Sequence, residues 1–227
     1  GVQLERVAHL RPFRLPGGEA AVREGWRAAA GLRWEMGERD GIEPVMARML
    51  ERGVNAPVTT SVGRLFDAVA ALAGVADRSR FEGQAAMMLE REIGDLVTDE
   101  AYPFPEGDWE PLLREVSREA RRPQRPPQRP SGRLRSSGSP ARPPALLFPD
   151  VVAAKFHNAL VGWIAEVAGR SGVRQVVLSG GVFQNRYLTE RTAAVLKGRG
   201  FAVYTHQRVP PNDGGIALGQ AVLAGGG

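Results

Sequence analysis

Apolar residues recur at helical spacing through the first half of the chain, three or four positions apart. This periodicity predicts amphipathic helices, because positions spaced in this way share one helix face. The run Thr59-Thr60-Ser61 is suited to capping a helix that follows it, and Gly74 is suited to ending that helix. Helices are expected over residues 19–32, 42–50, 62–72 and 84–90, with a loop over 103–108. We therefore interpret residues 1–116 as a mostly helical part.

Beyond residue 145, helical stretches alternate with short runs typical of buried strands. The expected order is a helix over 151–167, a strand over 174–178, a helix over 187–196, a strand over 201–204 and a helix over 216–223. This α-β-α-β-α order predicts an α/β fold class, with helices packed on a small sheet. A glycine turn follows each strand, so both turns are expected where open α/β sheets bind ligands, at the carboxyl ends of neighbouring strands. Residues 146–227 are thus interpreted as a C-terminal α/β subdomain.

Residues 117–145, between these parts, have the composition of a disordered insertion. They contain eight arginines, seven prolines and one acidic residue, Glu119, with Leu134 as the one large apolar residue. Such a segment buries too little apolar surface to offset the entropy of ordering it. We expect a solvated Arg/Pro/Ser-rich tether, although its charge alone could also attract RNA or an acidic partner.

Charge and composition exclude several classes of protein. The insertion carries a net charge of +7 (eight arginines and one glutamate), so the rest of the chain carries about −2 of the total of +5. This distribution argues against a nucleic-acid-binding surface on the folded part. The chain has no uninterrupted apolar stretch of about 18 residues, the length a membrane span needs, and its first residues lack a signal-peptide core. Without cysteine there is no disulfide or thiolate chemistry, and a cytoplasmic protein is expected.

The two glycine turns carry the candidate chemistry. Gly180 and Gly181 allow close backbone approach to a phosphate, or serve a structural turn with positive φ. Asn185 is suited to binding a phosphate or sugar, and equally to capping the next helix. Asp213 is a hard oxygen ligand for a divalent metal or a partner for a ribose hydroxyl, but it is also an ordinary turn residue. Two such turns on adjacent strand ends predict a nucleotide or metal–phosphate cleft.

Other polar residues carry weaker signals. His157 lies one position from an apolar stripe, so we expect a packed, hydrogen-bonded histidine rather than a ligand. Asp67 is placed on the polar side of its helix, where it could face solvent. Gly83 opens a helix and could act as its cap. Ser179 has no evident base, and no histidine pair has the spacing of a metal motif.

Several runs, in a fixed order and spanning nearly all the chain except the insertion, together resemble the HypF carbamoyltransferase family. They are His9 to Phe13 with Leu15 to Gly18, Gly63 to Ala70, Phe81 to Ala86, Phe156-His157-Asn158, Ser179 to Asn185, and Asn212 to Gln220. The resemblance implies part of an actin-like (ASKHA, RNase H-like) ATPase fold, shared with the enzymes that make threonylcarbamoyl-adenosine in tRNA.

The resemblance also implies a reaction. Carbamoyl phosphate and ATP give carbamoyl-adenylate, and the carbamoyl group is transferred to the C-terminal cysteine of HypE, where it becomes a cyanide ligand of nickel–iron hydrogenases. By the same resemblance, Asp213 matches the family's metal-binding aspartate, and Gly180, Gly181 and Asn185 match its nucleotide-phosphate loop. Asp67 and Gly83 match its ribose contacts. The catalytic residues and the identity of the divalent metal stay open.

The sequence departs from the family pattern at the metal site. The family also uses closely spaced histidines from an earlier His-rich run, and this sequence has no such run. We therefore expect an N-terminally truncated fragment that carries one wall of the cleft and has no turnover of its own. Two alternatives remain open here: a tRNA threonylcarbamoyl-adenosine synthase-like enzyme, and a non-catalytic nucleotide-binding or interaction module.

Overall fold

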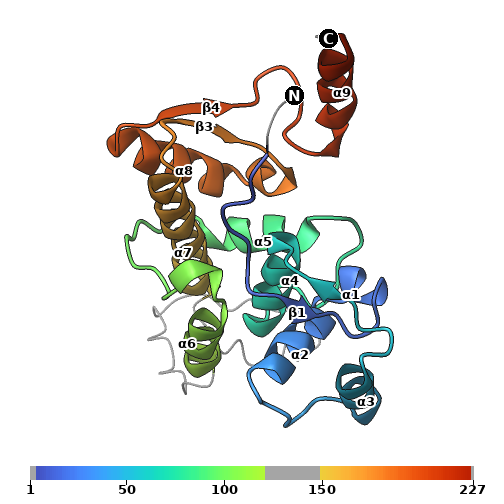
Figure 1. Cartoon of the computed structure of the whole chain (residues 1–227). Helices are drawn as coiled ribbons and strands as arrows, with labels where there is room; N and C mark the ends of the chain where they lie inside the picture. Colours follow the sequence, from blue (N-terminus) through green and yellow to red (C-terminus); the bar gives the residue numbers. More distant parts are fainter. Residues whose placement is uncertain (1–3, 121–148, 226–227) are drawn as a thin grey trace, which may run out of the picture.

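The computed structural model describes residues 4–120 and 149–225 (Figure 1). The first stretch contains β1 (Phe13–Arg14), α1 (Ala20–Arg23), α2 (Gly25–Glu35), α3 (Pro44–Arg52), β2 (Val58–Thr59), α4 (Val62–Leu72), α5 (Gln84–Ile93), the short 3-10 helix η1 (Pro105–Gly107) and α6 (Glu110–Ala120). The second contains α7 (Pro149–Arg170), β3 (Gln175–Leu178), η2 (Gly181–Gln184), α8 (Arg186–Gly198), β4 (Ala202–Thr205), η3 (Asp213–Gly215) and α9 (Ile216–Gly225). The predicted α/β fold class is confirmed.

Helices α2 and α4 form the centre of the first part, and two glycines let α2 approach its neighbours closely. A Cβ added at Gly25 would lie 2.7 Å from the carbonyl oxygen of Asp67, and one at Gly31 would lie 2.0 Å from that of Arg14. The main core forms around this contact and includes side chains from β1, α4, α5, α6 and α7. Only glycine at these two positions permits the observed spacing, since the facing atoms belong to the backbone.

The predicted helices are largely present, with one break. Helix α4 covers the expected residues. The Ser61 hydroxyl accepts a hydrogen bond from the amide of Arg64, which confirms a cap in the predicted run and identifies Ser61 as its residue. The helix expected over 19–32 is instead two helices, because Glu24 has the non-helical dihedrals φ −114° and ψ 85°. Its carboxylate pairs with Arg27 at 2.5 Å, and the bend lets α2 begin at Gly25 against α4.

Helix α6 was not predicted, and it extends four residues into the predicted insertion. Its last turn is held by Glu119, which accepts hydrogen bonds from the Tyr102 hydroxyl at 2.5 Å and from the Lys155 ammonium group at 2.9 Å. These contacts fix residues 117–120 as helix, so the insertion cannot begin at residue 117. The remaining residues of the predicted insertion, 121–145, lie outside the described residues.

The second part has the predicted α-β-α-β-α order. Helix α7 extends from the helical part to a two-stranded sheet in which β3 and β4 pair in parallel, with Leu178 opposite Thr205 (Figure 1). Helix α8 forms the crossover between the strands. A second, smaller core lies between α7, α8 and the sheet and includes Leu178, Leu196 and Phe201.

The sheet and α9 leave apolar side chains exposed. Val177 and Tyr204 alternate with inward-facing residues of β3 and β4 and are more than half exposed, as are Leu218, Val222 and Leu223 of α9. Helix α9 stands apart from the other helices in Figure 1, and none of its residues is buried. Because parallel sheets are normally covered on both faces, this is an uncovered surface of the described structure.

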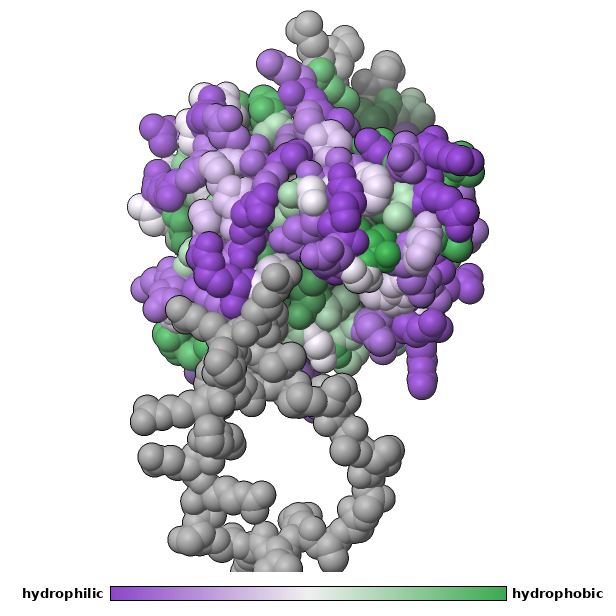
Figure 2. Space-filling model, turned by 90° about the horizontal axis from the view of Figure 1, so that it is seen from below, coloured by the Kyte–Doolittle hydropathy of each residue, from purple (hydrophilic) through white to green (hydrophobic). Residues whose placement is uncertain are grey.

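The opposite end of the molecule differs in character. Seen from below, most of the surface in view is hydrophilic, with smaller hydrophobic areas between (Figure 2). Within residues 4–120 and 149–225, none of the helices combines the length and hydropathy needed to cross a membrane.

Candidate functional site

The two glycine turns predicted to share one edge of the sheet are in direct contact. The amide of Gly180, in the first turn, donates to the carbonyl oxygen of Pro211, in the second, at 2.7 Å. Gly180 has φ 104°, a conformation that side chains disfavour, and no other atom lies within 4 Å of where its Cβ would be. A Cβ at Gly181 would lie 4.0 Å from Cβ of Asn212. The parallel strands therefore place both turns side by side at the carboxyl edge of the sheet, and there is open space next to Gly180.

The second turn is organised by Asn212 and leaves Asp213 accessible. The Asn212 side-chain oxygen accepts from the amide of Gly214 at 3.1 Å, and its carbonyl oxygen accepts from the amide of Gly215 at 3.0 Å. Asp213 is exposed and begins η3, directly before α9. Its carboxylate is thus available to a cation. The part of the chain that the structure describes contains no group of three or more His, Cys, Asp or Glu residues suited to a metal ion. Asp213 alone does not make a metal site.

Asn185 ends the first turn and is buried rather than open to a ligand. Its side-chain oxygen accepts from the amide of Leu188 at 2.8 Å and caps α8, which is the alternative stated for it from sequence. Its side-chain nitrogen lies 2.8 Å from Nε2 of His157. His157 is fully buried and hydrogen-bonded, as expected from its place beside the apolar stripe.

Asp67 does not face solvent, so that expectation is wrong. The residue is 3% exposed, because α4 is buried on nearly all sides from Leu65 to Ala70. Burial raises the pKa of its carboxyl to about 6, against the opposing effect of Arg64, and nearby Glu82 raises it further. Nη1 of Arg64 forms an ion pair with Oδ2 at 2.8 Å, without the geometry of a hydrogen bond. Each carboxylate oxygen has more than one acceptor site, so this ion pair leaves Asp67 able to accept from a further hydroxyl.

Gly83 is at the start of α5 and follows Glu82, whose charge acts on this carboxylate. It is the N-cap of the helix with φ 78°, and its backbone is open, with no atom within 4 Å of a Cβ position. Asp67 and Gly83 thus belong to α4 and α5, whereas Gly180, Gly181, Asn185 and Asp213 gather at the sheet edge. The two groups are connected through the core, because the ring of Phe66, next to Asp67, lies 5.2 Å from the ring of His157.

Ser179 has a partner that sequence reasoning missed. Nε2 of His206 lies 2.9 Å from the Ser179 hydroxyl. The strand register explains this contact: Leu178 is opposite Thr205, so the next residue of each strand is also side by side. The predicted strands, 174–178 and 201–204, would place Ser179 opposite Thr205 if aligned by their carboxyl ends; the pair appears because β4 continues to Thr205.

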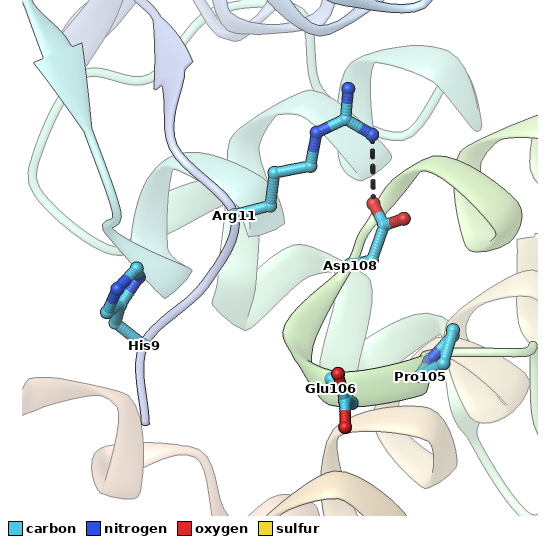
Figure 3. A pocket seen from close by; sticks show the side chains of 5 residues that line it. All are labelled: His9, Arg11, Pro105, Glu106 and Asp108. Carbon is cyan, nitrogen blue, oxygen red and sulfur yellow. Dashed lines mark hydrogen bonds and ion pairs between the residues drawn. The ribbon is translucent and has the colours of Figure 1, made fainter. Parts of the chain in front are cut away.

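A separate polar pocket of about 480 Å³ lies between the N-terminal segment and η1, lined by His9, Arg11, Pro105, Glu106 and Asp108 (Figure 3). The Arg11 guanidinium crosses it and donates to Asp108 at 3.1 Å. Glu106 has φ 52°, an uncommon conformation outside glycine. None of the residues predicted for the nucleotide or metal lines this pocket.

Comparison with known proteins identifies relatives over almost the whole chain. The family model described as "Carbamoyltransferase, Kae1-like Domain, second subdomain" matches residues 1–133 and 146–220. The chain is 32% identical over 250 residues to carbamoyltransferase HypF of Synechocystis sp., covering 95% of this chain and 29% of that protein. It is 35% identical over 248 residues to carbamoyltransferase HypF2 of Cupriavidus necator, covering 99% of this chain and 30% of that protein.

Solved structures give the same result. A crystal structure of full-length HypF in the phosphate- and nucleotide-bound form superposes with a TM-score of 0.74 and 33% identity, over 97% of this chain and 29% of that one. HypF of T. kodakarensis superposes with a TM-score of 0.74 and 27% identity, over 97% of this chain and 30% of that one. The chain spans less than a third of the length of these four relatives.

Proposed function

Because the chain belongs to the HypF carbamoyltransferase family, we propose that it forms one wall of a site that transfers a carbamoyl group from carbamoyl-adenylate to the C-terminal cysteine of a HypE-like acceptor protein. In this reaction the acceptor thiolate attacks the carbamoyl carbon, the bond to the adenylate phosphate breaks, and AMP leaves. Carbamoyl phosphate and ATP supply the adenylate. We expect the setting to be cytoplasmic.

The observation that carries this proposal is the contact between the two glycine turns. The hydrogen bond from Gly180 to Pro211 holds both turns at the carboxyl edge of a parallel sheet, the usual ligand position in open α/β folds. Since the Gly180 amide is used in this contact, Gly180 shapes the turn, and we assign the phosphate to the backbone that follows it, at Gly181. Amides held in place before a ligand binds stabilise charge on a phosphate or departing adenylate.

Asp67 and Gly83 are assigned to the ribose. The Asp67 carboxylate, paired with Arg64 at 2.8 Å, has acceptor capacity left for a ribose hydroxyl, and the backbone at Gly83 is open, with no atom within 4 Å of a Cβ position. Asn185 supports the loop rather than contacting the nucleotide, because its side-chain nitrogen bonds His157 and its side-chain oxygen bonds the amide of Leu188.

Asp213 supplies one oxygen ligand toward a divalent metal, which would neutralise phosphate charge when bound. The described residues do not complete a metal site, so no step above is assigned to the metal. For the same reason we expect no steady turnover by this chain alone. Steady transfer that depends on carbamoyl-adenylate, measured with the purified 227-residue chain, would refute that expectation.

Calorimetric titration tests the binding site itself. The purified chain is titrated with ATP in the presence of Mg²⁺, and Asp213→Asn is compared with Asp95→Asn, a matched change at an exposed aspartate following α5. We expect a several-fold weaker affinity for Asp213→Asn only. Equal affinities for both variants would remove Asp213 from the site, and no binding by the unmodified chain would contradict the proposed nucleotide site.

A further inference from the structure

His157 lies in the centre of the molecule and links α7 to the first glycine turn. Its Nδ1 is 2.7 Å from the carbonyl oxygen of Ala153, one turn earlier in α7, and its Nε2 is 2.8 Å from the side-chain nitrogen of Asn185. A carbonyl oxygen only accepts hydrogen bonds, so Nδ1 must carry the proton. In the neutral ring Nε2 then accepts, and it accepts from the Asn185 amide group.

The surroundings of His157 keep the ring neutral. The residue is fully buried, and burial lowers its pKa to about 4. The rings of Phe66, Phe156 and Tyr187 lie edge-on to the imidazole, with centroids 5.2, 5.8 and 5.5 Å away. These packed rings hold the imidazole in one orientation. In it, Nδ1 bonds the backbone of α7 and Nε2 bonds the first glycine turn.

The bond from Asn185 to His157 also fixes which way the asparagine amide points. With its NH₂ group on Nε2, the Asn185 oxygen is directed to the amide of Leu188, which it caps at 2.8 Å. The reversed amide would place two acceptors against each other and leave the helix cap unmade. A backbone hydrogen bond also connects the turn to this asparagine: the main-chain amide of Asn185 donates to the carbonyl oxygen of Val182 at 3.2 Å.

The next residue of α7 supports the same region. The Asn158 side-chain oxygen accepts from the Tyr187 hydroxyl at 3.0 Å, and its nitrogen donates to the carbonyl oxygens of Thr98 and Glu100 at 2.9 and 2.8 Å. The run Phe156-His157-Asn158 thus connects α7 to α4, to the glycine turn and to the loop before η1, with no side-chain hydrogen-bonding group left over for a ligand.

We infer that His157 is a positioning residue for the glycine turn: by accepting from Asn185 it fixes the turn over Gly180–Asn185 and the start of α8 in the conformation that the nucleotide meets. The role of that turn in nucleotide binding rests on the proposed function, whereas its dependence on His157 does not.

Two substitutions of His157 separate this role from general stabilisation. His157→Phe fills the space of the ring without an acceptor, and His157→Gln offers a side-chain oxygen to Asn185. Amide hydrogen exchange is measured for residues 180–188 and, as a control, for α2. We expect His157→Phe to accelerate exchange at 180–188 about tenfold more than at α2, because it leaves the Asn185 amide group buried without a partner. His157→Gln should restore most of the protection.

The results distinguish the inference from the proposed function. Equal acceleration at 180–188 and at α2, or no rescue by His157→Gln, would overturn the positioning role. If exchange behaves as expected but the unmodified chain fails to bind ATP, the positioning role stands and the proposed function falls. Should His157→Phe not fold, imidazole ¹⁵N shifts of the unmodified chain at neutral pH decide: a proton on Nδ1 alone supports the inference, and a proton on Nε2 contradicts it.

Discussion

Replacing Asp67 by asparagine should stabilise the protein at neutral pH while removing a charge from the proposed site. Burial raises the pKa of this carboxyl from 3.8 to about 6. Between these values the folded state binds more protons than the unfolded state, so the free energy of unfolding falls as the pH rises through this window. The shift of about two units corresponds to about 3 kcal/mol at 1.36 kcal/mol per unit. Asparagine keeps the shape of the side chain without the titration.

The assay is urea unfolding of both proteins at about pH 4 and about pH 8. The stability of Asp67→Asn relative to the unmodified chain should rise by about 2 kcal/mol from about pH 4 to about pH 8. The rise is smaller than the full value of about 3 kcal/mol because Asp67 of the unfolded chain is already partly ionised at about pH 4. The ion pair with Arg64 forms and breaks with the charge on Asp67, so its contribution is part of the same pH-dependent difference. His157 titrates in both proteins, so its contribution to the difference cancels. A stability difference that is the same at both pH values would refute the assigned burial of this carboxylate.

Two further predictions concern packing and protonation. Gly31→Ala should lower the free energy of unfolding by about 3 kcal/mol or more, because its Cβ would meet the backbone of Arg14. The control, Gly162→Ala, lies inside α7 with open space around it and should be neutral or stabilising by up to about 1 kcal/mol. Thermal unfolding followed by circular dichroism compares the two variants, and equal Tm values would contradict the close approach of α2. His157 has a depressed pKa, so the unfolded state takes up its proton first and stability should fall as the pH drops from about 6.5 toward 4. The unmodified chain should therefore lose stability relative to His157→Gln over that range, and parallel pH profiles from chemical unfolding would exclude this.

The sequence predicts the C-terminal part well because its signals are local. Strands over β3 and β4, the crossover helix between them and a glycine turn after each strand suffice to place Gly180 and Asp213 at one edge. Parallel pairing accounts for the shared edge, whereas the hydrogen bond from Gly180 to Pro211 depends on the path of the loop after β4. The roles assigned to these residues in binding stay predictions.

The errors have long-range causes. Asp67 is polar, but it lies in a helix of small and apolar residues that is packed on nearly all sides, and no local pattern shows that Gly25 and α2 cover it. Helix α6 follows a proline-containing loop and runs into an arginine-rich sequence. Its end is stabilised by Tyr102 and Lys155, the latter 36 positions from Glu119. The pairing of Ser179 with His206 likewise depends on strand register.

Titration of the ¹⁵N-labelled chain with ATP and Mg²⁺, followed by amide chemical shifts, locates the nucleotide directly. If the paired glycine turns form the binding site, the largest changes will fall in residues 180–185 and 212–215, with a second group around Asp67 and Gly83. Changes centred instead on the pocket of His9, Arg11 and Glu106, or no saturable change at the glycine turns, would contradict a nucleotide site at this edge of the sheet.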